Sequence, residues 1–271
     1  MKNTLVLIKL GGSVLKNPEL LSSFAKQIKL LQEQNTAIVI VHGAGPAIDQ
    51  KLAESNIKSS KVLGLRVTDA ATLAVVKEQL CIINESIVSS LSAQGSSAIS
   101  FSPEHESVFA AEKYQVEIAA GPIDLGFVGK IQAVDADKIK KFLNQNSIPV
   151  VAPLAFDKTG LLYNINADSA ALALAAAISV NKMINVTDVP GLLEDLNDSN
   201  SVIRKLSLSQ AESLIENGKI GGGMLPKLES CVEAVKAGVN SVQIINGKTP
   251  NSLLDAMNES DSGGTEIYKD L

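Results

Sequence analysis

The sequence predicts an α/β fold with one mostly parallel central sheet, and three observations support this prediction. Residues 5–10 and 37–41 are continuous apolar runs, as expected of strands that are buried on both faces. Between them, from Leu20 to Leu31, apolar residues recur at helical spacing. Each run then ends at a glycine turn. Such strand-helix-strand units form right-handed crossovers, and ligands bind beyond the carboxyl ends of their strands.

The same alternation continues to the end of the chain. We expect a long helix over 70–93, strands over 148–152, 183–187 and 239–245, helices over 167–179, 207–217, 225–237 and 250–257, and an edge strand over 265–268. Between them, short alternating segments at 108–111, 114–119 and 126–134 predict a small antiparallel insertion. No repeat or linker marks a boundary, so we expect a single domain over 1–271.

Composition narrows the class of function. The 271 residues are 45% apolar and carry a net charge of −5, so no overall basic charge favours nucleic acid or anionic membranes as partners. Aromatic residues make up 3%, too few for base-stacking platforms. Cys81 and Cys231 form neither a disulfide framework nor a metal pair, which predicts a reducing compartment.

Targeting signals and membrane spans are not expected either. Lys9 interrupts the first apolar run, which is too short for a signal-peptide core. The longest apolar run, at 170–180, is shorter than the roughly 20 residues that cross a bilayer. We therefore expect a soluble, cytoplasmic protein with a small-molecule substrate.

Several familiar site patterns fail on spacing. Gly43-Ala-Gly45 is followed by Ile48, where a dinucleotide-binding turn needs its third glycine. Gly247-Lys-Thr249 resembles the end of a phosphate-binding P-loop, but Val242 holds the position of the upstream glycine. With only His42 and His105 present, a hydrolytic triad and a zinc site are also disfavoured, and no metal ligands are assigned. We expect His42 to form a hydrogen bond at its strand end.

Two lysines are candidates for binding an anion. Lys9 ends the first strand, where an unpaired ammonium is costly to bury, although its side chain could instead extend to solvent. Lys227 follows Gly221-Gly-Gly223-Met-Leu-Pro226 at a predicted helix start, whose free N–H groups favour negative charge. An ordinary solvated charge remains an equal alternative for Lys227.

Polar residues at two further helix starts are also candidates. Asn164 and Asn166 share one face of an extended segment, and Asp168 opens the next helix, where Asn166 and Asp168 could also serve as caps. Arg66 precedes another helix start and could bind a carboxylate through two hydrogen bonds, or could lie unpaired at the surface. Thr68 or Asp69 could cap the helix that follows.

Taken in order, these motifs resemble the amino acid kinase family. The motifs that carry the resemblance are Lys9-Leu-Gly-Gly-Ser13, His42-Gly-Ala-Gly-Pro46, Gly64-Leu-Arg-Val-Thr-Asp69, Asn164-Ile-Asn-Ala-Asp168, Thr187-Asp-Val-Pro-Gly191 and Gly222-Gly-Met-Leu-Pro-Lys227. The resemblance implies a three-layer α/β/α sandwich. It also implies ATP-dependent phosphorylation of the side-chain carboxylate of N-acetyl-L-glutamate in arginine biosynthesis, with Mg²⁺ bridging the nucleotide phosphates.

The resemblance also implies a role for each matching residue. Lys9 and Lys227 would flank the transferring phosphoryl group, and Asp168 would hold both lysines. Residues up to about 180 would bind the acceptor and form a dimer, and residues 181–271 would mainly bind the nucleotide. The implied acceptor residues are Gly43, Ala44, Gly45, Arg66, Asn164 and Asn166. The implied nucleotide residues are Gly11, Gly12, Thr187, Asp188, Gly191, Gly221, Gly222 and Gly223.

The chain also departs from the family pattern. Ala44 replaces the usual middle glycine of its loop, residues 101–106 lack the usual glycine-rich sequence, and Asn251 stands where a histidine is common. Two alternatives remain open: a kinase acting on carrier-bound aminoadipate, and a non-catalytic, amino-acid-sensing kinase-like module. The apolar stripe over 70–93 and the resemblance together favour a homodimer. With the first strand beginning at about Thr4, we expect neither a hexamer nor inhibition by arginine.

Overall fold

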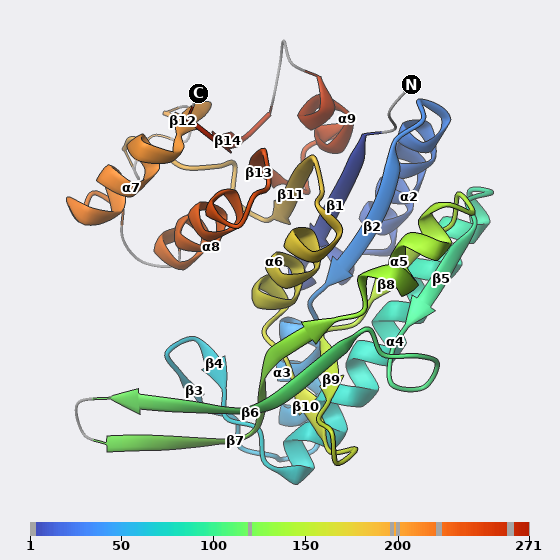
Figure 1. Ribbon diagram of the computed structural model, residues 1–271, viewed down its shortest axis with the longest axis vertical. Helices are drawn as coiled ribbons and strands as arrows, with labels where there is room; N and C mark the ends of the chain where they lie inside the picture. The colour runs from blue at the N-terminus through green and yellow to red at the C-terminus, as the bar shows by residue number, and fades with distance from the viewer. Residues whose placement is uncertain are drawn as a thin grey trace.

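The computed structural model describes residues 4–118, 121–195, 198, 201–220, 224–258 and 263–270 (Figure 1). The strands of its main sheet are β1 (Leu5–Leu10), β2 (Ala37–His42), β5 (Ala98–Phe101), β8 (Ile148–Val151), β11 (Lys182–Thr187), β12 (Lys205–Ser207), β13 (Ser241–Asn246) and β14 (Thr265–Tyr268). These eight strands lie in the order β12-β14-β13-β11-β1-β2-β8-β5. All neighbours run parallel except β13 and β14, so the predicted mostly parallel sheet is confirmed.

Helices cover both faces of this sheet. One face carries α1 (Gly12–Leu15), α2 (Pro18–Glu33), α4 (Ala70–Ala93) and α9 (Ser252–Met257), and the other carries α5 (Ala136–Leu143), α6 (Ala167–Ile178), α7 (Leu208–Glu216) and α8 (Leu225–Lys236). Side chains alternate along each strand, so Val6 and Ile8 of β1 enter the core beneath α2, while Leu7 enters the core beneath α6. The result is the three-layer α/β/α sandwich that the resemblance implies.

The prediction of an edge strand at 265–268 is wrong. β14 lies inside the sheet, between β12 and β13, and its Thr265 is fully buried. The edge position belongs to β12, a three-residue strand that pairs parallel to β14. A three-residue segment has too little apolar pattern to predict a strand, so the sequence gives no sign that another strand lies outside β14.

The antiparallel insertion is present but differs in detail from the prediction. Segments 108–111 and 114–119 were expected to be separate, but residues 109–118 form one strand, β6 (Phe109–Ile118), and residue 119 lies outside the described part of the chain. Register shifts within the pairing of β6 with β7 (Gly121–Val134) produce the broken pattern. β9 (Leu154–Phe156) and β10 (Leu162–Asn164) join them in a small closed barrel.

Two further elements complete the region around the carboxyl ends of β1 and β2. The helix α3 (Gly45–Glu54) follows β2 directly and packs against α1 and α4. A short hairpin of β3 (Lys61–Val62) and β4 (Leu65–Arg66) leads from α3 toward α4. Figure 1 shows this hairpin beside the barrel strands β6 and β7.

Candidate active site

The two predicted glycine turns meet at the carboxyl ends of β1 and β2. Gly12 begins α1, and Gly45 begins α3. A Cβ atom on Gly12 would lie 2.8 Å from Pro46 Cδ and 3.2 Å from the Gly45 backbone nitrogen, so only glycine allows the turns this close contact. Gly45 itself faces open space. The two turns thus form one surface of exposed backbone.

Ala44, between the two glycines of the second turn, lines the same cavity as they do. Its methyl group is buried in an apolar cluster with Ile48, Leu52 and Leu80, on the side of the loop that faces α3 and α4. Its φ of −136° is ordinary for a residue with a side chain. The departure from the family pattern at this position is therefore accommodated by packing against the core.

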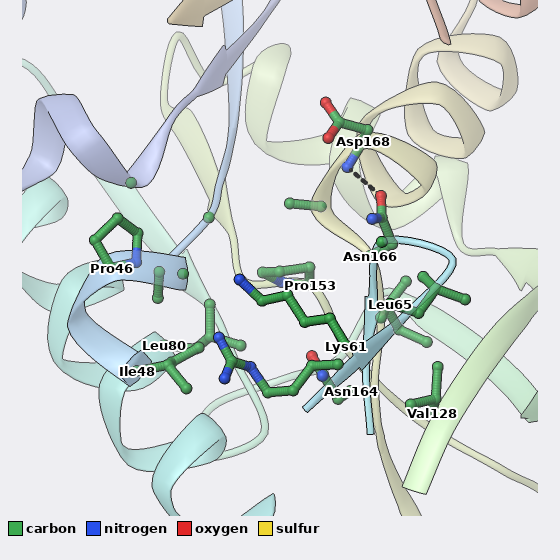
Figure 2. Close-up of a pocket in the computed structure, with 18 of the residues that line it drawn as sticks. Pro46, Ile48, Lys61, Leu65, Leu80, Val128, Pro153, Asn164, Asn166 and Asp168 are labelled. Atoms are coloured by element: carbon green, nitrogen blue, oxygen red, sulfur yellow. Dashed lines mark hydrogen bonds between the residues drawn. The ribbon is translucent and has the colours of Figure 1, made fainter. Parts of the chain in front are cut away.

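Lys9 is paired with Asp168. The Lys9 side chain is 14% exposed, and its Nζ lies 2.7 Å from Asp168 Oδ1. Asp168 is held at the start of α6 because the Asn166 side chain accepts hydrogen bonds from the backbone N–H groups of Asp168 and Ser169, at 2.8 and 3.0 Å (Figure 2). The capping interpretation is therefore correct for Asn166, while the Asp168 carboxylate is directed to Lys9.

Arg66 is buried and paired, so its interpretation as an unpaired surface residue is wrong. Its guanidinium donates to the Asp49 carboxylate and, at 2.6 Å, to Ser59 Oγ. Lys61 Nζ lies 3.5 Å from the same carboxylate. Partial burial would raise the pKa of Asp49, but the hydrogen bond and charge of Arg66, with a contribution from Lys61, hold it below its usual value.

Asn164 is linked to the Arg66 backbone through a threonine. Asn164 Nδ2 donates to Thr68 Oγ1 at 3.2 Å, and this hydroxyl donates to the Arg66 carbonyl at 2.8 Å. Asp69, rather than Thr68, caps α4 by accepting from the Thr72 N–H at 2.7 Å. The polar residues of β4 and β10 are thereby held in fixed relative positions.

These groups border one cavity of about 280 Å³ (Figure 2). Its polar lining comes from Lys9, Lys61, Arg66, Asn164, Asn166 and Asp168, together with the turn residues Gly12, Gly43 and Gly45. Its apolar lining includes Ile48, Leu65, Leu80 and Val128. A small molecule with two carboxylates and an apolar group matches this combination of cations and apolar wall.

Lys227 occupies the first turn of α8, with Pro226 before it, as predicted. It is partly exposed, and within the described residues it forms no ion pair with a carboxylate. One turn further along the helix, Cys231 Sγ accepts a 3.4 Å hydrogen bond from Asn185 Nδ2 of β11. Asp168 thus contacts one of the two lysines, Lys9, and the position of Lys227 beside a phosphoryl group stays a prediction.

Three of the predicted nucleotide residues, Thr187, Asp188 and Gly191, lie at or just after the carboxyl end of β11, whereas Gly11 and Gly12 follow β1. Thr187 is buried, and its hydroxyl is within 3.3 Å of the Val189 and Ile245 carbonyls, whereas Asp188 is exposed. Gly191 has a φ of +141°, and a Cβ there would lie 2.7 Å from Thr265 Oγ1, so its position requires glycine. Gly221, Gly222 and Gly223 lie outside the described residues.

Sequence reasoning missed Asp49, Ser59 and Asn185. Asp49 and Ser59 contact Arg66 from 17 and 7 residues earlier in the chain, and no local pattern indicates those contacts. Asn185 carried a visible signal, because it is a single amide within the apolar strand Met183 to Val186. His42 forms its expected hydrogen bond, with Asn84 Nδ2 at 3.0 Å.

Comparison with known proteins identifies the family. A model described as the amino acid kinase family matches residues 4–246. The chain belongs to the amino acid kinase family. It is 40% identical to an acetylglutamate kinase of Brucella anthropi over 98% of this chain and 91% of that protein. It is 39% identical to an acetylglutamate kinase of Methanococcus maripaludis over 97% of this chain and 92% of that protein.

Solved structures of other proteins share this fold. An N-acetylglutamate synthase from Neisseria gonorrhoeae aligns over the whole chain with a TM-score of 0.88 at 24% identity, and the chain spans 61% of that protein's length. A carbamate kinase from Giardia aligns over 100% of both chains with a TM-score of 0.71 at 15% identity. At these identities the likeness establishes the fold, and the activity has to be argued from the site.

Two features are absent from the described residues, a membrane-spanning helix and a cluster of metal-binding side chains. No helix among them is both long and apolar enough to cross a bilayer. Within the same residues, no three histidine, cysteine, aspartate or glutamate side chains gather closely enough to hold a metal ion.

Proposed function

We propose that this chain is a cytoplasmic acetylglutamate kinase of arginine biosynthesis, which transfers the γ-phosphoryl group of ATP to the side-chain carboxylate of N-acetyl-L-glutamate. The observation that carries the proposal is the Lys9–Asp168 pair, which lines one cavity together with two joined glycine turns and a buried arginine. Relatives of about 40% identity over nearly the full chain are acetylglutamate kinases, which supports the same activity.

The acceptor would lie in the cavity with its two carboxylates at opposite ends. Arg66 and Asn164 would bind the α-carboxylate, because a guanidinium offers paired donors that match a carboxylate. The acetyl group would pack on the apolar side of the cavity, near Leu65 and Val128. This orientation directs the side-chain carboxylate toward Lys9.

The chemistry then depends on alignment and charge. The acceptor carboxylate is already ionised near pH 7, since a glutamate side chain has a pKa of about 4.3, so no general base is required. Its oxygen attacks the γ-phosphorus of ATP, the bond to the β-phosphate oxygen breaks, and an acyl phosphate and ADP form. Lys9 and Lys227 would neutralise charge on the transferring group, and Asp168 orients Lys9.

The nucleotide would arrive as its Mg²⁺ complex and lie over residues 181–271. Backbone N–H groups of Gly12 and Gly45 would face its phosphate oxygens, whereas those of Gly11 and Gly43 already donate to the Val186 and Leu10 carbonyls, at 2.9 and 3.0 Å. Thr187, Asp188, Gly191 and the glycines at 221–223 would border the remainder of the nucleotide. Mg²⁺ would be held by the phosphates of ATP as part of the substrate.

The fold alone does not separate this activity from the alternatives, because a synthase shares the fold. A coupled ADP-release assay with N-acetylglutamate, glutamate, aspartate and aminoadipate tests the proposal. We expect turnover with N-acetylglutamate and with none of the other three acceptors. Trapping of the acyl phosphate with hydroxylamine should give one hydroxamate for each ADP released. Turnover with aminoadipate instead would favour the kinase that acts on carrier-bound aminoadipate. Absence of turnover with every acceptor would favour the non-catalytic, amino-acid-sensing module.

We also propose that the chain forms a homodimer through the face that contains α4. Ile82 of α4 and Leu30 of α2 are 54% and 46% exposed, and these two helices pack against each other. Light scattering should give a mass of twice 28.4 kDa. An Ile82→Glu variant should shift this mass toward the monomer, while an unchanged dimer would place the interface elsewhere.

A further inference from the structure

Asn185 is an unusual residue for its position. It lies in the middle of β11, where Met183, Ile184 and Val186 are fully buried, and it is itself 5% exposed. A strand covered by helices on both faces is normally apolar throughout. A buried amide with an unmet hydrogen bond destabilises a fold, so its presence here calls for a compensating role.

The pairing of strands places Asn185 directly beside Lys9. In the parallel register of β1 and β11, Lys9 is the partner of Asn185, and Ile244 of β13 is the partner on the other side. Partners in register point to the same face of a sheet. Asn185 and Lys9 therefore share the face that α6 and α8 cover, and on this face Lys9 reaches Asp168.

Among the described residues, the Asn185 amide nitrogen has a hydrogen-bond partner and the amide oxygen has none. Its Nδ2 donates to Cys231 Sγ at 3.4 Å, whereas its Oδ1 is buried and has no hydrogen-bond partner among the described residues. Cys231 is one helical turn after Lys227. Burial raises the pKa of the Cys231 thiol to about 12, and the charges of Asp168 and Lys9 also influence it, so the cluster adjoins the ion pair.

We propose that Asn185 is a positioning residue for Lys9, with its free Oδ1 accepting a hydrogen bond from the Lys9 ammonium when nucleotide is bound. An ammonium has three protons, and the Asp168 carboxylate accepts one of them. A second acceptor beneath the lysine fixes the direction of the remaining proton, which points to the transferring phosphoryl group. This inference rests on the proposed kinase activity.

The test compares Asn185→Leu, which keeps the branching and the number of heavy atoms and removes both polar atoms, with the wild type. We expect kcat to fall roughly tenfold, as for loss of a hydrogen bond to a charged group, with both KM values within twofold. The melting temperature should stay level or rise, because an unsatisfied buried oxygen is removed.

Ser96→Ala provides the matched control. It removes another buried side-chain oxygen without a partner, next to β5 at the far edge of the sheet. We expect its melting temperature to behave like that of Asn185→Leu and its kcat to match the wild type. If kcat of Asn185→Leu stays within twofold of the wild type, or falls together with the melting temperature, the proposal is wrong.

A readout that is independent of turnover separates this proposal from the proposed function. The chemical shift of the Lys9 ε-carbon can be measured by NMR in the complex with MgADP, with Lys9→Arg used for assignment. We expect this chemical shift to differ between Asn185→Leu and the wild type, because the Lys9 ammonium loses a hydrogen-bond acceptor. If the wild type is inactive but its Lys9 signal differs from that of Asn185→Leu, only the kinase activity is rejected. If the wild type is active and the two Lys9 signals are the same, the role of Asn185 is rejected.

Discussion

The acceptor half and the nucleotide half of the site are built in different ways. On the acceptor side, charged side chains are fixed by other side chains, Lys9 by Asp168 and Arg66 by Asp49. At the end of β11, by contrast, the Thr187 hydroxyl contacts backbone carbonyls, and Gly191 packs tightly against Thr265. Substitutions on the acceptor side should therefore change kinetic constants, and substitutions at the end of β11 should also change stability.

The largest effect is expected for Lys9→Ala. This change removes positive charge from the transferring phosphoryl group, and losses of this type are roughly 3 kcal/mol, or more than a hundredfold in kcat. Folding should persist, because Asp168 is 40% exposed and gains access to water. The coupled assay and the melting temperature measure both effects. Lys16→Ala, which removes an exposed lysine after α1, is the control, and near wild-type kcat in Lys9→Ala would remove Lys9 from the mechanism.

Arg66→Ala should affect the acceptor alone. The KM for N-acetylglutamate should rise about thirtyfold, equivalent to about 2 kcal/mol, because a hydrogen-bonded charge pair with the α-carboxylate is lost. The KM for ATP should change little. Steady-state kinetics with each substrate varied in turn measure the split, with Lys58→Ala as a control for an exposed charge nearby. Equal increases in both KM values would place Arg66 outside the acceptor site.

Gly191→Ala should combine a kinetic effect with a loss of stability. The added methyl requires a rare backbone conformation and overlaps Thr265 Oγ1, which we expect to cost roughly 1 to 2 kcal/mol of unfolding free energy. The KM for ATP should also rise, because Gly191 borders the proposed nucleotide site. Urea unfolding measures the loss, and Gly263→Ala, where a methyl meets open space, is the control. Unchanged stability in Gly191→Ala would contradict the contrast between the two halves.

The smallest expected effect is a pH dependence of stability caused by His42, the last residue of β2 before the turn Gly43-Ala-Gly45. Burial lowers its pKa from 6.5 to about 4, so below pH 6.5 the unfolded chain binds a proton that the folded chain does not. Stability should therefore fall by about 1 kcal/mol between pH 7.5 and 5.5 and continue to fall toward pH 4. Urea unfolding of His42→Gln should show a shallower pH dependence, while exposed His105→Gln should follow the wild type.

The sequence predicted best those features that depend on local pattern. The strand at residues 5–10 and the helix at 70–93 match the structure residue for residue, because each has a clear apolar pattern bounded by polar or glycine residues. The edge of the sheet was misplaced, because three residues of β12 carry no periodic signal.

Tertiary geometry accounts for what the sequence did not reveal about the site. The polar residues at strand ends were recognisable, but the pairing of Arg66 with Asp49 depends on how α3 faces β4. The burial of the Ala44 methyl depends on α4, which begins 26 residues further along the chain. Likewise, Asn185 was visible as a polar residue, but its position next to Lys9 follows from the pairing of β1 with β11.

The central position of β1 has a consequence for how the protein is made. One side of β1 pairs with β2, which follows soon after it, and the other side pairs with β11. The Leu5 N–H donates to Asn181 Oδ1, 176 residues away along the chain. During synthesis, one edge of β1 therefore stays unpaired until β11 leaves the ribosome. Unpaired strand edges of this kind can pair with other chains and lead to aggregation. We expect this interval to be when the nascent protein depends most on chaperones.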